Sequence, residues 1–522
     1  MNPVEHAEKA RLKIQDELDY AKTQLERNKL GQFATPLFLA LDIVKYAKEL
    51  MPEKIGIRFL DPAFGTGAFY SALLQVFDSS RIESAEGYEI DAKYGNEAKR
   101  LWRGTQLRLH MADFTSKIPP TIEKDRANLI ICNPPYVRHH HLSLDQKDRL
   151  RKIVEHTIGI RLSGLSGLYC YYMCIAHRWM ADGSTAGWLV PSEFMDVNYG
   201  LGLKKYLLDK VTLLRIHRFD PTDVQFHDAD VSSTVVWFKN AHPPKDHFVE
   251  FTLGGTHGNP KESKLIPLEA LRNTSKWTWY PVMDHNVITV VRGSKLSELF
   301  SIKRGLATGA NEFFILDKEK ISQYKIPTDF LVPILPMPRD LEVDEIRADE
   351  KGNPILKNKL FLLSCNLSED KVKLMYPSLW EYLKMGLESG VGDRYLCRHR
   401  TPWYSQEQRP PAPFLCSYFG RKTEEREKPF RFILNHSNAT ASNSYLMLYP
   451  LDNLKRALNA DPYLYTKVWE CLNRITSDTL VSSGRVYGGG LHKLEPMELS
   501  NVPADDIMKE PKIMRHIKEG LF

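Results

Sequence analysis

Residues 58–77 read RFLDPAFGTGAFYSALLQVF, an apolar strand followed by a glycine-rich turn and an amphipathic helix. Gly65 and Gly67 can adopt backbone angles that are closed to other residues, and they let a ligand approach the main chain. The turn has neither a Walker lysine nor the full GxGxxG of a dinucleotide site. It has Asp61 directly before it, and a carboxylate suits a positively charged ligand better than a pyrophosphate.

Two further acidic residues follow at the ends of the next predicted strands. Glu89 ends the strand in GYEID, where a carboxylate can accept both hydroxyls of a ribose. Asp113 closes the strand in MADF, where it can accept from an adenine amino group while Phe114 packs beside the ring. Each acid alone is better explained as a solvated strand end. Together with the glycine turn, the three match a cationic nucleoside without phosphates, which describes S-adenosylmethionine.

A second notable stretch is ANLIICNPPYVRHHH, residues 127–141. Its apolar run has the length of a strand that is covered on both faces. Pro134 removes an N–H group and keeps Asn133 out of the helical region, so the strand ends in an extended turn at the sheet edge where ligands bind in α/β proteins. An ordinary strand-ending turn is the alternative. Three consecutive histidines cannot easily face one ion, and we predict no metal site.

The wider chain shows an α/β pattern up to about residue 240 and a different composition after it. Short apolar runs alternate with helical patterns from residue 57 to about 240, which predicts a mostly parallel sheet with helices on both faces. The runs LLRIHRF and STVVWFKN suit an antiparallel hairpin at one edge, which gives seven strands in all. We predict a first domain over residues 1–245, a linker over 246–294 and an α+β domain over 295–522.

Composition adds only broad limits. The 522 residues are 43% hydrophobic and 26% charged, as in a soluble globular protein. We find no apolar run long enough to cross a membrane and no secretory signal. Seven scattered cysteines without a CxxC pair suit a reducing cytoplasm. A net charge of +6 permits a polyanionic partner without requiring one.

In this order, the motifs GQFATP, DPAFGTG, GYEID, ADF and NPPY resemble those of the gamma-class N6-adenine DNA methyltransferases of bacterial type II restriction–modification systems. The resemblance covers residues 31–240 closely and the later segments RGLATGANEFFIL and RVYGGGLHKLEP loosely. It implies a Rossmann-like S-adenosylmethionine-dependent methyltransferase domain and a DNA target-recognition domain. The implied enzyme is a cytoplasmic monomer that methylates a flipped-out adenine in double-stranded DNA, with a cognate endonuclease as its genetic partner.

The resemblance also implies roles for particular residues. The cofactor would be bound by Gln32, Phe33, Thr35, Asp61, Ala63, Gly65, Gly67, Glu89, Ile90, Asp113, Phe114 and Asn133. Catalysis would fall to Asn133, Pro134, Pro135, Tyr136 and Phe226. In this scheme Thr35 contacts the methionine carboxylate, Ile90 packs on the cofactor adenine, and Phe226 meets the flipped base. A core aromatic residue is the alternative for Phe226.

Basic and aromatic residues are interleaved in the second half of the chain. Phosphate and base-edge contacts use such side chains. The residues expected to contact DNA are Arg138, Arg398, Arg400, Tyr404, Arg421, Lys422 and Arg485. A solvated basic face is the alternative for any one of them.

Three other functions compete with DNA methylation. NPPY also occurs in methyltransferases that act on protein glutamine or on guanine N2 of ribosomal RNA, although the glutamine enzymes are typically shorter and lack a large second domain. A restriction endonuclease fused to the methyltransferase is less favoured, because no clear PD…(D/E)xK constellation is present and about 30 residues precede GQFATP. A DNA-binding protein without catalysis is disfavoured by the intact motifs.

Overall fold

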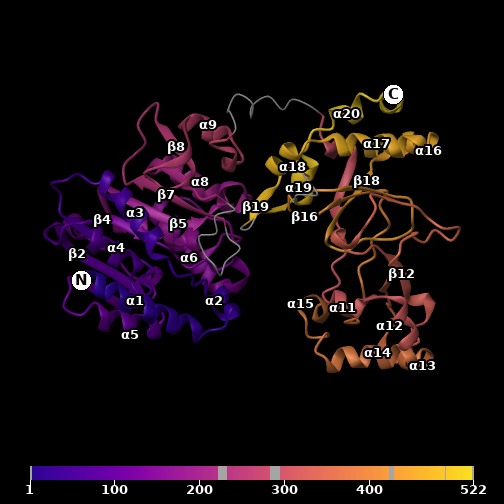
Figure 1. Ribbon diagram of the computed structural model, residues 1–522, viewed down its shortest axis with the longest axis horizontal. Coiled ribbons are helices and arrows are strands. Elements are labelled where there is room, and N and C mark those ends of the chain that lie inside the picture. Colours follow the sequence, from indigo (N-terminus) through magenta and orange to yellow (C-terminus); the bar gives the residue numbers. More distant parts are fainter. Residues whose placement is uncertain (1–2, 221–231, 283–293, 423–427, 488–489, 520–522) are drawn as a thin grey trace. The chain divides into compact units, whose positions relative to one another are not determined.

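The computed structural model describes residues 3–220, 232–282, 294–422, 428–487 and 490–519 (Figure 1). The chain divides into two compact units, one made mainly of residues 1–290 and the other mainly of residues 291–522. None of the helices in these described ranges is both long enough and apolar enough to cross a bilayer.

A single large sheet organises the first unit. Within the described ranges it has nine strands in the order β3-β2-β1-β4-β5-β7-β6-β8-β9, all parallel except β7 and β9. The strands are β1 (Ile57–Asp61), β2 (Ile82–Glu89), β3 (Leu107–Met111), β4 (Ala127–Cys132), β5 (Met180–Pro191), β6 (Thr212–Arg218), β7 (Ser233–Lys239), β8 (Phe248–Gly255) and β9 (Pro260–Pro267).

Helices cover both faces of this sheet. Residues of α3, α4 and α5 share one hydrophobic core with one face, and residues of α6, α7 and α8 share a second core with the other face. The helices of this unit are α1 (Pro3–Tyr20), α2 (Gln24–Leu30), α3 (Leu37–Leu50), α4 (Ala68–Val76), α5 (Ala92–Leu101), α6 (Leu144–Ile158), α7 (Leu168–Ile175), α8 (Leu201–Asp209) and α9 (Leu268–Asn273).

The central strand β4 shows why the apolar run in the sequence predicts a two-faced strand. All six of its residues are buried. Leu129 and Ile131 enter the core under α3 and α4, whereas Ile130 and Cys132 enter the core under α7. Successive side chains of a strand point to opposite faces, so both faces of β4 need apolar residues and the alternation of polar residues is lost.

The sheet differs from the prediction in its extent. Residues 248–267, predicted as part of a linker, form β8 and β9 and add two strands beyond β6. The hairpin of β6 and β7 is therefore not at the edge of the sheet. The strand pattern was hidden by the surrounding proline and glycine residues, of which Gly254 and Gly255 adopt positive φ angles at the end of β8.

The second unit combines small sheets with helices, as an α+β domain does. Its described strands form a five-stranded sheet in the order β10-β18-β15-β17-β13 and two three-stranded sheets, β11-β14-β12 and β16-β20-β19. The strands are β10 (Phe300–Arg304), β11 (Ile315–Leu316), β12 (Leu331–Ile334), β13 (Glu345–Ile346), β14 (Leu360–Leu363), β15 (Phe414–Ser417), β16 (Phe419–Gly420), β17 (Phe432–Asn435), β18 (Tyr445–Pro450), β19 (Arg485–Tyr487) and β20 (Leu491–Lys493).

Helices of the second unit pack on two separate cores. One core joins the five-stranded sheet to α16 and α17, and another joins β11 and β14 to α13 and α14. The helices are α11 (Asn311–Phe314), α12 (Lys318–Gln323), α13 (Glu369–Met375), α14 (Pro377–Glu388), α15 (Tyr395–Arg398), α16 (Asp452–Ala460), α17 (Tyr463–Arg474), α18 (Ser477–Ser483), α19 (Pro496–Ser500), α20 (Asp505–Met508) and α21 (Pro511–Glu519).

Candidate active site

A cavity of about 380 Å³ lies at the carboxyl ends of β1, β2 and β4. The residues that line it come from all five motifs found in the sequence and from helices that include α1. Of the predicted site residues, the cavity is lined by Gln32, Phe33, Thr35, Asp61, Ala63, Gly65, Glu89, Ile90, Asn133 and Pro135. The structure thus brings together segments that lie up to about 100 residues apart, at the edge where α/β sheets bind ligands.

The glycine turn between β1 and α4 is held in a defined conformation. Gly65 has a φ of +57°, and its N–H donates to Oε2 of Glu89 at 2.9 Å. Gly67 has a φ of +92°, and a Cβ atom there would lie 2.7 Å from the ring of Phe64 and from Nε1 of Trp102. A side chain is disfavoured at Gly65 by the positive φ angle, and at Gly67 also by the neighbouring rings. Gly67 is not among the residues that line the cavity.

Asp61 is buried at the floor of the cavity, with 1% of its surface exposed. Its Oδ1 accepts from the N–H of Ala63 at 3.1 Å. Burial raises the pKa of this carboxyl from 3.8 to about 7, an effect that hydrogen bonds from Ala63 and Cys132 partly offset and the nearby Glu89 reinforces. A positively charged ligand would favour the ionised form.

Glu89 lies at the end of β2 and is tied to the main chain on both sides. Its Oε2 accepts from Gly65, and its Oε1 accepts from the N–H of Asp91 at 2.7 Å. Burial raises its pKa despite these bonds. The neighbouring Ile90 leaves 70% of its surface exposed at the cavity. An exposed apolar side chain beside a carboxylate suits a ligand with an aromatic ring and hydroxyl groups.

The amide of Asn133 is oriented by residues of the segment before α3. Its Nδ2 donates to the carbonyl oxygen of Phe33 at 3.0 Å and to Oγ1 of Thr35 at 3.1 Å. With both donors used, the amide oxygen Oδ1 must face the other way. This oxygen is buried and accepts no hydrogen bond from the described residues. The site therefore contains one acceptor that is held ready for a donor.

Tyr136 is packed beneath the same segment. It has 8% of its surface exposed, its hydroxyl donates to the carbonyl oxygen of Leu189, and its N–H donates to the carbonyl oxygen of Gly31 at 3.1 Å. Its ring centroid lies 5.5 Å from that of Phe33. Pro134 is also buried. Neither Tyr136 nor Pro134 lines the cavity, whereas Pro135 does.

The structure places Asp113 and Phe114 differently from the prediction. Oδ1 of Asp113 accepts from the N–H and the hydroxyl of Thr115, and Oδ2 lies 3.3 Å from Nη2 of Arg149. Phe114 is buried against the ring of Trp179, with centroids 5.0 Å apart. Neither residue lines the cavity. An Asp followed two residues later by Thr can accept hydrogen bonds from that Thr, and Asp113 makes this local contact in place of one to the cavity.

Other residues line this part of the cavity in their place. The wall next to the predicted adenine site includes Ala112 and Tyr172, and the sequence analysis missed both. Tyr172 lies in α7 and is buried. The pattern LYCYYMCI is apolar around the whole helix, so no single tyrosine in it stands out as a ligand contact.

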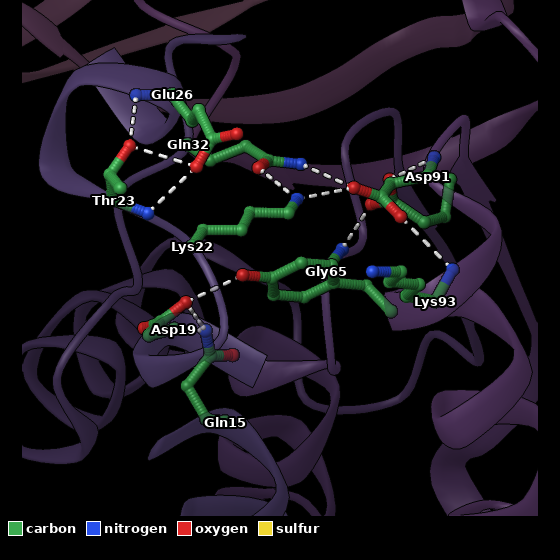
Figure 2. Close-up of polar contacts among 11 residues, drawn as sticks. Gln15, Asp19, Lys22, Thr23, Glu26, Gln32, Gly65, Asp91 and Lys93 are labelled. Carbon is green, nitrogen blue, oxygen red and sulfur yellow. Dashed lines mark hydrogen bonds and ion pairs between the residues drawn. The ribbon is translucent and has the colours of Figure 1, made fainter. Parts of the chain in front are cut away.

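Helix α1 and its following turn also contribute to the site, which the sequence did not indicate. Gln15 and Asp19 line the cavity together with Asp91 and Tyr94. As Figure 2 shows, Nζ of Lys22 lies between Oε1 of Gln32 and Oδ2 of Asp91, at 2.6 and 2.5 Å. The cavity is thus lined by four carboxylates, those of Asp19, Asp61, Glu89 and Asp91.

The residues predicted to contact DNA fall into two groups. Arg138, Arg398, Arg421 and Lys422 are exposed. The other three have intramolecular partners, which differs from the prediction. Arg400 donates to the carbonyl oxygens of Ala307 and Thr308, the buried Tyr404 donates to that of Leu367, and Arg485 pairs with Glu498. Phe226, predicted to meet the flipped base, lies outside the described residues.

The strand order, with β7 antiparallel between β5 and β6, and the acid-lined cavity over β1, β2 and β4 define a methyltransferase of Rossmann-like fold. Comparison with known proteins agrees. Residues 69–225 match the Eco57I restriction-modification methylase family, and residues 274–521 match the C-terminal domain of the type II methyltransferase M.Eco57I. The chain belongs to the type II restriction–modification methyltransferases.

Individual relatives match along most of the chain. The type II methyltransferase M.AccI of Acinetobacter calcoaceticus is 26% identical over 93% of this chain and 87% of its own length. M.XamI of Xanthomonas campestris pv. amaranthicola is 27% identical over 85% of this chain and 80% of its own length. Among solved structures, the type IIL restriction-modification enzyme MmeI in complex with DNA shares the fold, with a TM-score of 0.53, 14% identity, and coverage of 95% of this chain and 67% of that one.

The raised pKa of Asp61 predicts how stability depends on pH. Between about pH 4 and pH 7 the folded protein holds the proton of Asp61 and the unfolded chain loses it, so the free energy of unfolding falls as pH rises through this window. We expect Asp61→Asn to remove this fall and to be more stable than the wild type at pH 8, by an amount on the order of a few kcal/mol.

Thermal unfolding without added ligand, measured from pH 4 to pH 8, would test this. The difference between the melting temperatures of Asp61→Asn and the wild type should grow with pH and level off above pH 7. Asp16→Asn, at an exposed position of α1, serves as the control. Parallel curves for Asp61→Asn and the wild type would contradict the assignment.

Proposed function

We propose that this protein transfers a methyl group from S-adenosylmethionine to N6 of an adenine in a specific double-stranded DNA sequence. The proposal is carried by Asn133, whose amide is oriented so that its oxygen is buried without a donor beside an acid-lined cavity. The same family membership supports protection of host DNA as the biological role. Protein glutamine and ribosomal RNA guanine remain the competing acceptors to be tested.

The residues of the cavity fit S-adenosylmethionine. Four carboxylates line the cavity, and Lys22 beside it is paired with Asp91. Such a wall favours a ligand with positive charge and disfavours phosphates. Glu89 would accept the ribose hydroxyls, Ile90 would pack on the adenine ring, and the Thr35 hydroxyl would bind the methionine carboxylate. The bound cofactor supplies an electrophilic methyl group on its sulfonium.

Asn133 and Pro134 would activate the adenine nitrogen. The lone pair of N6 is delocalised into the ring, so the nitrogen must become more tetrahedral before it can attack. Two acceptors against its N–H bonds favour that geometry and the positive charge that develops. The amide oxygen of Asn133 would be the first acceptor and the main-chain carbonyl of Pro134 the second. The product ammonium is acidic enough to lose its proton without a dedicated base.

The adenine would have to leave the duplex to reach Asn133. Extrusion costs a few kcal/mol, which stacking on an aromatic side chain can offset by roughly 1–3 kcal/mol. Tyr136 is the expected platform. Because it is 8% exposed and packs against Phe33, a base can stack on its ring only after a neighbouring side chain moves. A role for Phe226 on the other face of the base stays a prediction.

Basic residues of the second unit would contact DNA. Arg421 and Lys422 follow β16 and are exposed. Arg304, which was not among the predicted DNA contacts, lies over the ring of Tyr418 at 4.0 Å from its centroid. Lys493 lies 5.3 Å from the same centroid and is paired with Glu495. Cations held on an aromatic ring lose less freedom when they bind a phosphate.

A competition assay separates the candidate acceptors. Tritiated S-adenosylmethionine is incubated with the protein and equal amounts of duplex DNA, a peptide-release factor and ribosomal RNA. We expect label in DNA alone, and N6-methyladenine as the labelled nucleoside after digestion. Label only in protein or RNA, or N4-methylcytosine as the product, would refute the proposal.

Replacing Asn133 should remove chemistry but not binding. We expect Asn133→Ala to lower kcat by at least about 100-fold, because a preorganised acceptor is lost, and to leave DNA affinity within a few-fold of the wild type. Asn128→Ala is the matched control, since Asn128 is buried in β4, the strand that leads to Asn133, and its amide bonds the backbone of Arg58 and Gly56. That control should lower the melting temperature and spare kcat at permissive temperature. Equal loss of DNA binding in Asn133→Ala would assign it a structural role.

The affinity for DNA should fall steeply with salt, because each phosphate contact releases a counterion. In a plot of log affinity against log salt concentration, we expect Arg421→Ala and Lys422→Ala each to reduce the slope by about 1. Fluorescence anisotropy with a labelled duplex measures this. Exposed Lys13 of α1 in the first unit supplies the control substitution, Lys13→Ala. A slope near zero in the wild type would contradict a phosphate-binding surface.

A further inference from the structure

Helix α1 is joined to the glycine turn by a chain of buried polar contacts. Arg11 has 1% of its surface exposed, and its guanidinium donates to both carboxylate oxygens of Glu8 at 2.8 and 2.7 Å. Its Nη1 also donates to Oγ1 of Thr66 at 3.1 Å. Thr66 is the residue between Gly65 and Gly67, and it lines the cavity. The charged pair therefore touches the very turn that faces the ligand.

Thr66 is held from several sides. Its hydroxyl accepts from Arg11 and donates to Oε1 of Gln15 at 2.6 Å, and its carbonyl oxygen accepts from Nε1 of Trp102 at 2.9 Å. The chain of contacts continues along α1, because Nε2 of Gln15 donates to Asp19 at 3.0 Å (Figure 2). Asp19 in turn accepts from the hydroxyl of Tyr94 in α5 at 2.6 Å. We call these contacts from Glu8 to Tyr94 the α1 relay.

The α1 relay is not explained by stability alone. Removing two charges from water costs several kcal/mol per ion, and a buried ion pair often contributes no more than apolar residues of the same size. The Glu8–Arg11 pair adds no net charge to the cavity. The pair provides a rigid donor that points at the Thr66 hydroxyl. A turn that is preorganised in this way loses less conformational freedom when a ligand binds.

We propose that the α1 relay sets the affinity for the cofactor by holding the Gly65–Gly67 turn in its binding conformation, with Thr66 as the positioning residue through which α1 acts. This inference rests on the proposed use of S-adenosylmethionine. It assigns α1 to cofactor binding and leaves the methyl-transfer step and DNA binding to other residues.

A pair of substitutions at Thr66 tests the hydroxyl directly. Thr66→Val keeps the shape and loses both hydrogen bonds, whereas Thr66→Ser keeps them. We expect Thr66→Val to raise the Kd for S-adenosylmethionine by about 10-fold, as the loss of one or two hydrogen bonds implies. Its kcat at saturating cofactor and its KM for DNA should stay within about twofold of the wild type. Thr66→Ser should restore the Kd.

Isothermal titration calorimetry with S-adenosylmethionine measures the Kd, and initial rates measure the kinetic constants. An unchanged Kd in Thr66→Val would overturn the proposal. A Kd in Thr66→Ser as high as in Thr66→Val would overturn it as well, since packing of the methyl group would then be the cause.

A double substitution tests the charged pair without leaving a lone buried charge. Glu8→Leu combined with Arg11→Met should melt at or above the wild-type temperature, because an apolar pair can replace a buried ion pair. Its Kd for S-adenosylmethionine should still rise several-fold. A wild-type Kd in this variant would overturn the proposal whatever its melting temperature. Lys13→Met, which removes an exposed ion pair with Glu17 on the same helix, is the control.

Calorimetry distinguishes a wrong cofactor from a wrong role for α1. If the wild-type protein gives no binding heat with S-adenosylmethionine, the proposed cofactor is wrong. If the wild type binds it and all relay variants bind it equally well, only the role of α1 is wrong.

Discussion

Two hydrogen bonds to the side chain of Asn133 underlie the candidate site. By engaging both amide hydrogens, Phe33 and Thr35 orient the amide and leave its oxygen as a buried acceptor. The geometry depends on residues about 100 positions apart, and it requires the segment 31–36 to lie across the end of β4. The close approach of Gly31 to Tyr136 secures this crossing, since a Cβ atom at Gly31 would lie 2.4 Å from the Tyr136 nitrogen. A neutral amide can keep this orientation at any physiological pH.

Two carboxylates of the cavity, those of Asp61 and Glu89, work against the folded state and would favour the binding of a cation. Burial raises the pKa values of Asp61 and Glu89, which means that the protein holds these carboxylates where their charged forms are disfavoured. A cationic ligand relieves that penalty, so part of the binding energy comes from the strain of the site itself. The glycine turn contributes in a different way, because its hydrogen bonds to Glu89 and to the α1 relay are in place before any ligand arrives.

The sequence predicted those parts of the fold and site that depend on local patterns. The run NLIIC, the glycine turn and Glu89 at a strand end all have signals within a few residues. Asp113 lies outside the cavity lining because its bond to Thr115 is just as local and competes with ligand binding, so its contact with the cofactor stays a prediction. The intramolecular bonds of Arg400 and Tyr404 had no signal in the sequence, because their partners, Thr308 and Leu367, are distant along the chain. Gln15 and Asp19 were missed because an exposed charged helix and a helix that faces a cavity have similar composition.

Strand β9 has a consequence for the behaviour of the protein in a crowded cell. Among the described residues it is the last strand of the large sheet, and half of its residues, including Lys261, Glu262 and Ser263, are exposed. An edge strand can recruit a strand from another molecule and start aggregation. Charged residues along the edge and a proline at each end, Pro260 and Pro267, oppose such recruitment. Strands β8 and β9 thus end the sheet with features that oppose pairing with another molecule.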